Sequence, residues 1–413
     1  MALLLAISTQ AFATRFAMST AVHQIQIDLG LSNLQVGWVL SAFVAGYAVP
    51  QFPVGLVVDW LGPYRVLLVS VIAWSSFTVL IGAVRWLPLA NLALALIVLR
   101  FLAGIGQAGV LTCSIKTIGR WMPLGERATA NGFFMMGLGL GGALAPPLIV
   151  RLIAAYGWPA PFLVFGLAGL ALATLWRAYG ADYPECHARV NAAELAYIQR
   201  DAEHRSSPAV SAASWRGLYR SRSVWALALS YGSASYTSYV FFTWFFLYVV
   251  NVRKMDPISG GWWAALPYVG VAMGTPAGGR VSDFLTLRLG KRRGRLLVVL
   301  IGEGLAAALI VAGGRVEEAR LGIVLLALAT GFHMFSQASS WAATIDLAPG
   351  QAGALFGVMN TLAQVAGAIS PILTPAIADR YGWIAALDFA AATAALAGFL
   401  WLFVNPERPA VAA

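Results

Sequence analysis

Hydrophobic residues gather along this chain in long runs that short polar connectors separate. Twelve runs are long enough for membrane-spanning helices, since one span needs about 20 mostly apolar residues. We place them at residues 2–22, 35–58, 66–85, 91–115, 128–150, 160–178, 223–250, 262–285, 295–314, 320–345, 353–377 and 384–404. The pattern predicts an all-α polytopic membrane protein with twelve transmembrane helices.

The second half of the chain repeats the first. Residues 156–158 read Tyr-Gly-Trp and recur at 381–383, a shift of 381 − 156 = 225 residues. Gly55 and Asp59 recur as Gly279 and Asp283 after a shift of 279 − 55 = 224. Because a repeated set of membrane helices usually surrounds a central path, we predict two pseudo-symmetric six-helix bundles.

One long polar segment, residues 179–222, divides the two sets of six spans. We predict an N-terminal bundle over 1–178, a cytoplasmic linker over 179–222, a C-terminal bundle over 223–404 and a cytoplasmic tail over 405–413. Within the linker, residues from Ala192 to Ile198 are expected to form a short amphipathic helix, with Asn191 as its cap.

Composition and charge narrow the class of protein. The chain is 60% hydrophobic and 11% charged, with a mean hydropathy of +0.76, far from the values of soluble domains. Its net charge is +10, and with both termini in the cytoplasm most basic residues fall in cytoplasmic segments, the bias that orients membrane proteins. No basic soluble module is present, so we expect the lipid bilayer, and no nucleic acid, as a partner.

Arg15 and Arg100 are the two cations expected inside the spans. An intramembrane Arg costs roughly 2.5–3.5 kcal/mol and normally faces the bundle interior. No Asp or Glu lies inside the first six spans, so these spans offer the two arginines no negative charge. A carboxylate substrate could supply it through bidentate hydrogen bonds. The alternative is that backbone carbonyls and Gln107 satisfy both side chains structurally.

Polar residues also follow one face of the span 320–345 in the second half. A continuous polar face on a membrane helix is expected to line water. The candidates are His333, Gln337, Ser340, Trp341 and Thr344 in this span, Tyr239 and Trp244 in span 223–250, and Asn360 in span 353–377. Packing is the alternative for the aromatic residues.

Two side chains in the second half can titrate inside the membrane. His333 could exchange a proton near neutral pH, or it could simply be hydrogen-bonded. Glu303 is a carboxylate in the middle of span 295–314. That span is expected to be peripheral, which favours a structural pairing for Glu303.

A repeated pattern of charge predicts a gate at the cytoplasmic ends of the helices. Asp59 is followed by Arg65, and Asp283 is followed by Lys291 and Arg292. A carboxylate at a helix end with basic residues a short loop away can form a charge lock between helices. Short basic loops are common, but two copies at matching repeat positions favour a gating role.

At these residues the chain resembles the major facilitator superfamily, whose signature loop has this acidic and basic pattern. Finer features resemble its anion:cation symporter family, which includes bacterial sugar-acid and aromatic-acid transporters and vesicular glutamate carriers. The residues that carry this resemblance are Gly46, Tyr47, Gln51 and Pro53; Trp74 and Ser75; Arg100 through Gly106; Trp121, Pro123 and Glu126 through Ala128; Pro184 and Glu194 through Ile198; Trp341 and Asp346 through Pro349; and Gly357, Asn360, Gly367 and Pro371.

The resemblance implies a fold of twelve helices in two bundles, which works by alternating access on substrates that are mostly organic anions. It also adds Tyr47 and Gln107 to Arg15 and Arg100 as candidate substrate-binding residues.

The chain departs from the family at two positions. Family members commonly carry an Asp-Arg pair in the first span and a Glu seven residues after the Arg of the fourth span, acids that are associated with proton coupling. Here Thr14 precedes Arg15, and Gln107 stands seven residues after Arg100. Proton coupling would therefore have to use His333 or Glu303; otherwise transport would be uniport or anion exchange.

We therefore expect a secondary transporter of a small organic anion such as a sugar acid or an aromatic acid. It would act as a monomer in the inner membrane, with no cofactor or bound metal, and a proton or sodium is the candidate coupling ion. A multidrug exporter is the alternative, disfavoured because span 128–150 lacks the exporters' Gly-Pro-(x)2-Gly-Gly pattern. The spans hold no catalytic constellation, which disfavours an enzyme. A non-transporting membrane sensor is the alternative from a different class.

Overall fold

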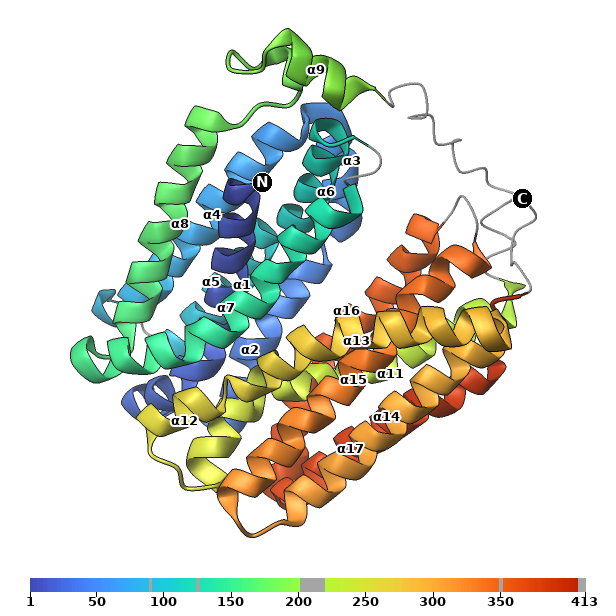
Figure 1. Ribbon diagram of the computed structural model, residues 1–413. Coiled ribbons are helices and arrows are strands. Elements are labelled where there is room, and N and C mark those ends of the chain that lie inside the picture. Colours follow the sequence, from blue (N-terminus) through green and yellow to red (C-terminus); the bar gives the residue numbers. More distant parts are fainter. Residues whose placement is uncertain (89–90, 124–126, 201–219, 349–351, 408–413) are drawn as a thin grey trace. The chain divides into compact units, whose positions relative to one another are not determined.

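The computed structural model describes the chain except for residues 89–90, 124–126, 201–219, 349–351 and 408–413 (Figure 1). All regular secondary structure in the described ranges is helical, which confirms the predicted all-α fold. The chain forms two compact units, Met1–Ser206 and Ser207–Ala413. The boundary between them lies inside the segment 179–222, where we expected a linker.

The first unit contains the helices up to residue 206. They are α1 (Ala2–Leu29), α2 (Asn33–Ala48), α3 (Gln51–Leu61), α4 (Pro63–Ala83), α5 (Leu92–Gln107), α6 (Gly109–Trp121), α7 (Arg127–Tyr156), α8 (Pro159–Tyr179) and α9 (Ala192–Gln199), with short 3-10 turns at Val84–Trp86 and Pro184–Cys186. The expected span 35–58 is divided into α2 and α3 before Gln51. Pro50 stands at this break, and it has no backbone N–H to continue the helical ladder.

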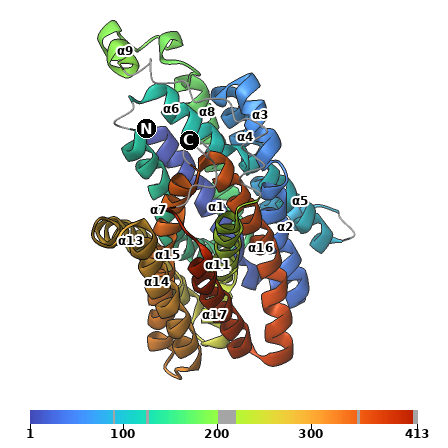
Figure 2. The same ribbon diagram turned by 90° about the vertical axis from the view of Figure 1, so that its right-hand side faces the viewer.

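The second unit repeats the order of long helices, and Figure 2 shows most of them. Its helices are α11 (Arg222–Leu247), α12 (Pro257–Trp263), α13 (Leu266–Leu289), α14 (Lys291–Arg315), α15 (Ala319–Leu347), α16 (Ala352–Tyr381) and α17 (Trp383–Leu400). A π-helical turn, Tyr248–Val252, extends α11, and a 3-10 turn, Trp401–Phe403, follows α17.

Glycines with positive φ mark matching corners of the two units. Gly157 has φ 81° and precedes α8, while Gly382 has φ 86° and precedes α17. Gly62 at φ 82° and Gly290 at φ 83° precede α4 and α14 in the same way. Because residues with a Cβ rarely adopt these angles, the repeated glycines set repeated turns between consecutive helices.

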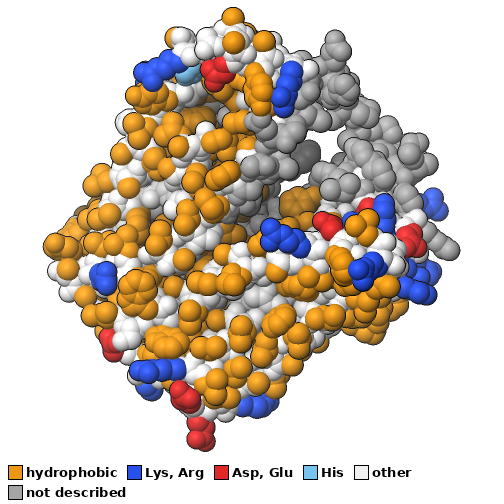
Figure 3. All heavy atoms as spheres, in the orientation of Figure 1, with side chains coloured by type: hydrophobic (Ala, Val, Ile, Leu, Met, Phe, Trp, Pro, Cys, Tyr) orange, Lys and Arg blue, Asp and Glu red, His pale blue; other side chains and the backbone are white. Residues whose placement is uncertain are grey.

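Eight helical stretches among the described residues are long and apolar enough to cross a membrane. Hydrophobic side chains cover much of the helices on the face shown in Figure 3. In the described residues as a whole, Trp60 and Leu287 are among the large hydrophobic side chains that are exposed. Helix α1 is not one of the eight, because it carries polar residues that are buried in the unit, including Gln10 and Thr14. An interior rich in polar groups is expected where a membrane bundle surrounds a polar site.

The linker helix begins at the expected residue. Asn191 caps α9, and its side-chain oxygen accepts a hydrogen bond from the backbone N–H of Glu194 at 2.8 Å. Residues 201–219 of the expected linker lie outside the described part of the chain.

Candidate functional site

Arg15 of α1 and Arg100 of α5 lie against the same aromatic ring. The central guanidinium carbon of Arg15 is 5.0 Å from the ring centroid of Phe43, and that of Arg100 is 4.4 Å from the same centroid. The Arg15 carbon also lies 4.6 Å from the ring centroid of Tyr47. Both cations thus use the π face of α2 residues in place of a counter-ion.

Close contact between α2 and α5 places these rings. A Cβ on Gly46 would lie 2.0 Å from the backbone oxygen of Phe101, and one on Gly104 would lie 2.2 Å from the backbone oxygen of Phe43. Only glycine permits backbones to approach so closely. This pair of glycines therefore holds Phe43 beside Arg100, which is one turn from Gly104.

Neither guanidinium has a hydrogen bond or an ion pair with any described residue. The Nε atoms of Arg15 and Arg100 are buried and have no hydrogen-bond partner, and Arg100 is only 4% exposed. No hydrogen bond joins Gln107 to either guanidinium; its side-chain amide nitrogen donates to the backbone oxygen of Ala11 at 2.9 Å. The structural alternative for the two arginines, with carbonyls and Gln107 as partners, is therefore not observed.

A small cavity of about 60 Å³ brings three of the predicted residues together. Arg15, Tyr47 and Gln107 line it, together with Ser8 and Phe12. A cavity of this size holds water or a single small group of atoms. It gives the Arg15 side chain space for an oxygen ligand.

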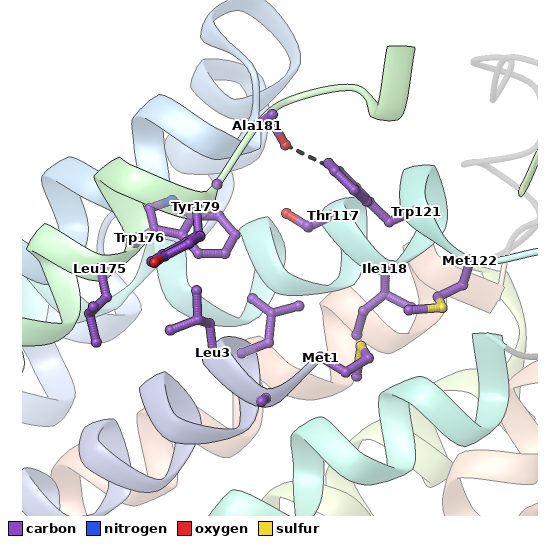
Figure 4. A pocket seen from close by; sticks show the side chains of 13 residues that line it. Met1, Leu3, Thr117, Ile118, Trp121, Met122, Leu175, Trp176, Tyr179 and Ala181 are labelled. Atoms are coloured by element: carbon purple, nitrogen blue, oxygen red, sulfur yellow. Dashed lines mark hydrogen bonds between the residues drawn. The ribbon is translucent and has the colours of Figure 1, made fainter. Parts of the chain in front are cut away.

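A larger cavity of about 450 Å³ lies elsewhere in the same unit (Figure 4). Its wall is formed by Met1, Leu3 and residues of α6 and α8, including Trp121, whose indole donates to the backbone oxygen of Ala181 at 3.1 Å. None of the predicted substrate-binding residues lines it. Its walls are mainly apolar.

In the second unit His333 and Glu303 form one buried pair. The Nδ1 atom of His333 lies 2.9 Å from the Oε2 atom of Glu303, and both side chains are 1% exposed. Ser336 and Gln337 also donate to Oε1 of Glu303, the latter at 3.0 Å. On the other side of the imidazole ring, Nε2 lies 2.8 Å from the hydroxyl oxygen of Ser238. The network joins α14, α15 and α11.

This network divides the polar face expected on span 320–345. His333 and Gln337 turn toward Glu303, because a buried carboxylate requires donors. Ser340 is buried and accepts a hydrogen bond from the Trp401 indole at 3.3 Å. Trp341 donates to the hydroxyl of Tyr231 on α11, also at 3.3 Å. The polar residues that we expected on one face of span 320–345 thus contact three neighbouring elements. Glu303 has the structural pairing that we favoured, with His333 as its partner.

Tyr239 and Asn360 meet through a residue that the sequence pattern did not single out. The Tyr239 hydroxyl donates to Oε1 of Gln364 at 3.1 Å, and the Gln364 amide donates to Oδ1 of Asn360 at 3.4 Å. Helical spacing offers a signal here, because Gln364 is four residues after Asn360. Trp244 has a different environment: it is buried, and its ring packs against Trp383 of α17.

The predicted gating residues have other partners than expected. Lys291 lies 2.9 Å from Asp346, and Arg295 lies 2.7 Å from it. Asp283 and the side chains of Arg65 and Arg292 are exposed, and no described residue forms an ion pair with Asp283. The pairing of Asp283 with Lys291 is therefore corrected to a pairing of Lys291 with Asp346. The side chain of Asp59 lies outside the described residues.

Two acidic residues at matching repeat positions cap the helices after these loops. Asp182 accepts a hydrogen bond from the backbone N–H of Tyr64 at 2.9 Å, at the start of α4. Glu407 accepts one from the backbone N–H of Arg292 at 3.2 Å, at the start of α14. Their spacing, 407 − 182 = 225, equals the shift of the Tyr-Gly-Trp repeat. Carboxylates at these positions satisfy free N–H groups and complement the helix dipole.

Comparison with known proteins places the chain in a family. The family model of the Major Facilitator Superfamily matches residues 3–371 and 256–413. A probable sulfoacetate transporter of Cupriavidus necator is 32% identical over 399 residues, which cover 96% of this chain and 91% of that protein. A probable galactarate/D-glucarate transporter of Bacillus subtilis is 31% identical over 414 residues, which cover 97% and 90%.

The fold also matches a solved transporter structure. A bacterial homolog to the human lysosomal transporter Spinster, in an inward-facing and unoccupied conformation, aligns with a TM-score of 0.78. The alignment covers 98% of this chain and 97% of the other at 17% sequence identity, which supports the fold alone. The chain is a multi-pass membrane protein, and it belongs to the Major Facilitator Superfamily.

Proposed function

We propose that this protein moves a small organic anion across the membrane by alternating access of its two bundles. The observation that carries the proposal is the pair of arginines, Arg15 and Arg100, which have no anionic partner among the described residues. A carboxylate matches the planar guanidinium through two parallel hydrogen bonds and would provide the missing charge. The relatives named for sulfoacetate and for galactarate/D-glucarate support an organic acid as substrate.

In this proposal Arg15 is the main anchor of the anion. It is only partly buried, it lines the small cavity, and it shares that cavity with Tyr47 and Gln107. Tyr47 can donate a hydrogen bond from its hydroxyl to a substrate oxygen, and Gln107 can do so from its amide if it leaves Ala11. In the second bundle, we retain Tyr239, Gln364 and Asn360 as substrate-binding candidates: the Tyr239 hydroxyl already donates to Gln364, while the Asn360 amide has N–H groups that can donate to a hydroxylated acid.

We further propose that the protein lacks the usual proton coupling. Thr14 cannot titrate, and its hydroxyl lies within hydrogen-bonding distance of the backbone oxygens of Gln10 and Ala11. Gln107 cannot titrate either. Transport would then be uniport or anion exchange, unless the His333–Glu303 pair carries the proton.

The test of the transport function is uptake of labelled organic acids into proteoliposomes that contain the purified protein. Arg15→Lys keeps the positive charge but loses the planar fork, so the apparent affinity should fall at least tenfold. Arg288→Lys is the matched control, because Arg288 is exposed on α13 and lies over the ring of Phe284.

Two outcomes would contradict the proposal. Unchanged affinity in Arg15→Lys would remove Arg15 as the anchor. Binding of an acid without any uptake, in vesicles shown to be sealed, would favour the non-transporting sensor.

A further inference from the structure

The first unit holds two positive charges close together, the guanidinium groups of Arg15 and Arg100. The guanidinium carbons of Arg15 and Arg100 lie 5.0 Å and 4.4 Å from the Phe43 centroid, so the distance between these two carbons is at most about 9.4 Å. The two charges are close enough to repel each other. Since Arg100 is 4% exposed, solvent screens this repulsion poorly.

No acidic side chain described in the first unit offsets those charges. In the first unit the sequence has no Asp or Glu from residue 29 to 58, from 60 to 125, or from 127 to 181. Asp28, near the end of α1, accepts a hydrogen bond from the Trp158 indole at 2.7 Å and lies 3.6 Å from Arg85. The described interior around Phe43 therefore carries two positive charges and no negative charge.

We infer that the transported substrate is a dianion, a small molecule with two acidic groups, of which one binds Arg15 and the other binds Arg100. This inference rests on the proposed transport function and adds the charge of the substrate. A monoanion would leave one buried guanidinium without a counter-ion, which is the costly state for an intramembrane charge. A chain of roughly four to six carbons, at about 1.5 Å per C–C bond, can reach both arginines.

Gln107 permits a test by addition of charge. Its amide lies in the same cavity as Arg15, and a glutamate has nearly the same shape. Gln107→Glu should supply one negative charge beside Arg15 and leave one cation unmatched. The preferred substrate should then change from a dianion to a monoanion.

The experiment compares matched acids that differ in one acidic group. The pairs are glucarate with gluconate and sulfoacetate with glycolate, all ionised at neutral pH. The full chain is reconstituted in proteoliposomes, and each acid is measured by uptake and by competition. We expect the parent protein to prefer the dianion of at least one pair tenfold or more, and Gln107→Glu to reduce that preference at least tenfold.

The control adds the same charge elsewhere in the same unit. Gln35 is exposed and closes a capping box with Ser32 at the start of α2. Glutamate serves equally well at this capping position. Gln35→Glu should therefore keep the parental preference, which separates a local effect from a general change in protein charge.

The outcomes distinguish this inference from the function on which it rests. Uptake of both acids of a pair with equal affinity by the parent would overturn the dianion inference and leave transport intact. A dianion preference that survives Gln107→Glu unchanged would also overturn it, because the two arginines would not be its source. Absence of uptake for every organic acid would refute the transport function itself.

Discussion

Replacement of Glu303 by leucine should destabilise the second unit, because Glu303 accepts the hydrogen bonds of three neighbours. Ser336 and Gln337 donate to one carboxylate oxygen, and His333 lies 2.9 Å from the other. Leucine is similar in size but accepts no hydrogen bond. The substitution therefore leaves buried polar groups on α15 that had partners in the parent.

The magnitude follows from the alternatives open to each group. The Ser336 hydroxyl can still donate to the backbone oxygen of His333 at 2.7 Å, and the Gln337 amide lies 3.2 Å from the Ser336 oxygen. Nδ1 of His333 has no second partner among the described residues. An unsatisfied buried group costs about 1–3 kcal/mol, and loss of one partner of a buried pair costs about 3–5 kcal/mol. We expect a loss of about 3 kcal/mol in the free energy of unfolding.

Glu303→Gln should cost much less. Its amide oxygen can accept from Ser336 and Gln337, and its amide nitrogen can donate to Nδ1 of a neutral His333, so every bond has a replacement. We expect a change within about 1 kcal/mol. Glu317→Leu is the control for the gain of a leucine, because Glu317 is exposed and surface substitutions usually stay within about 0.5 kcal/mol.

The assay measures unfolding of the purified protein in detergent, once by thermal melting and once by denaturant titration. We expect the parent to be the most stable, Glu303→Gln to be slightly less stable, and Glu303→Leu to be much less stable than both. Equal stability of Glu303→Leu and the parent would refute the network as a stabilising element. A large loss in Glu303→Gln would instead show that the negative charge, and not the hydrogen bonds, holds His333.

Three further predictions concern coupling, gating and packing. Addition of substrate should not acidify the interior of proteoliposomes that carry an internal pH dye. Stoichiometric proton entry with the parent protein would contradict the loss of proton coupling. The same proton entry with His333→Gln would also show that His333 does not carry the proton. Asp59→Asn should shift the resting population toward the inward-open state, since an interaction present in only one state biases the equilibrium by its differential energy. Cysteines introduced on the side expected to face the cytoplasm would be labelled in the variant and in the parent. Equal labelling of the two proteins would argue against a gate. Gly104→Ala should lower the free energy of unfolding by about 1–3 kcal/mol, because its Cβ would lie 2.2 Å from the Phe43 backbone oxygen. Gly119→Ala is the control, since a Cβ there meets nothing within 4 Å; equal melting temperatures of the two variants would contradict the close helix contact.

The linear pattern of the chain determined the helices and their repeat. Hydrophobic runs and turn residues act over a few neighbours, so the predicted spans coincide largely with helices, and Gly157 and Gly382 adopt matching turns. Short breaks nevertheless divide the spans 35–58, 91–115 and 262–285. The absence of acids from the first six spans can be counted in the sequence. It was enough to predict that Arg15 and Arg100 have no acidic partner inside the bundle.

Only the tertiary structure decided which side chains meet. Helical spacing puts His333, Gln337 and Ser340 near one face of α15, but the rotation and neighbours of that helix direct the first two to Glu303 and the third to Trp401. The same limit explains the partner of Lys291, which is Asp346 on α15 and not the nearby Asp283.

The shared ring of Arg15 and Arg100 is the other feature that the linear pattern did not reveal. Phe43 resembles any other aromatic residue of a membrane span until α2 and α5 pack through Gly46 and Gly104. That close contact brings residues from three helices to one point. Local patterns determine which segments are helical, whereas the packing of distant helices determines which charges share a site, because those contacts depend on the relative rotation and depth of each helix.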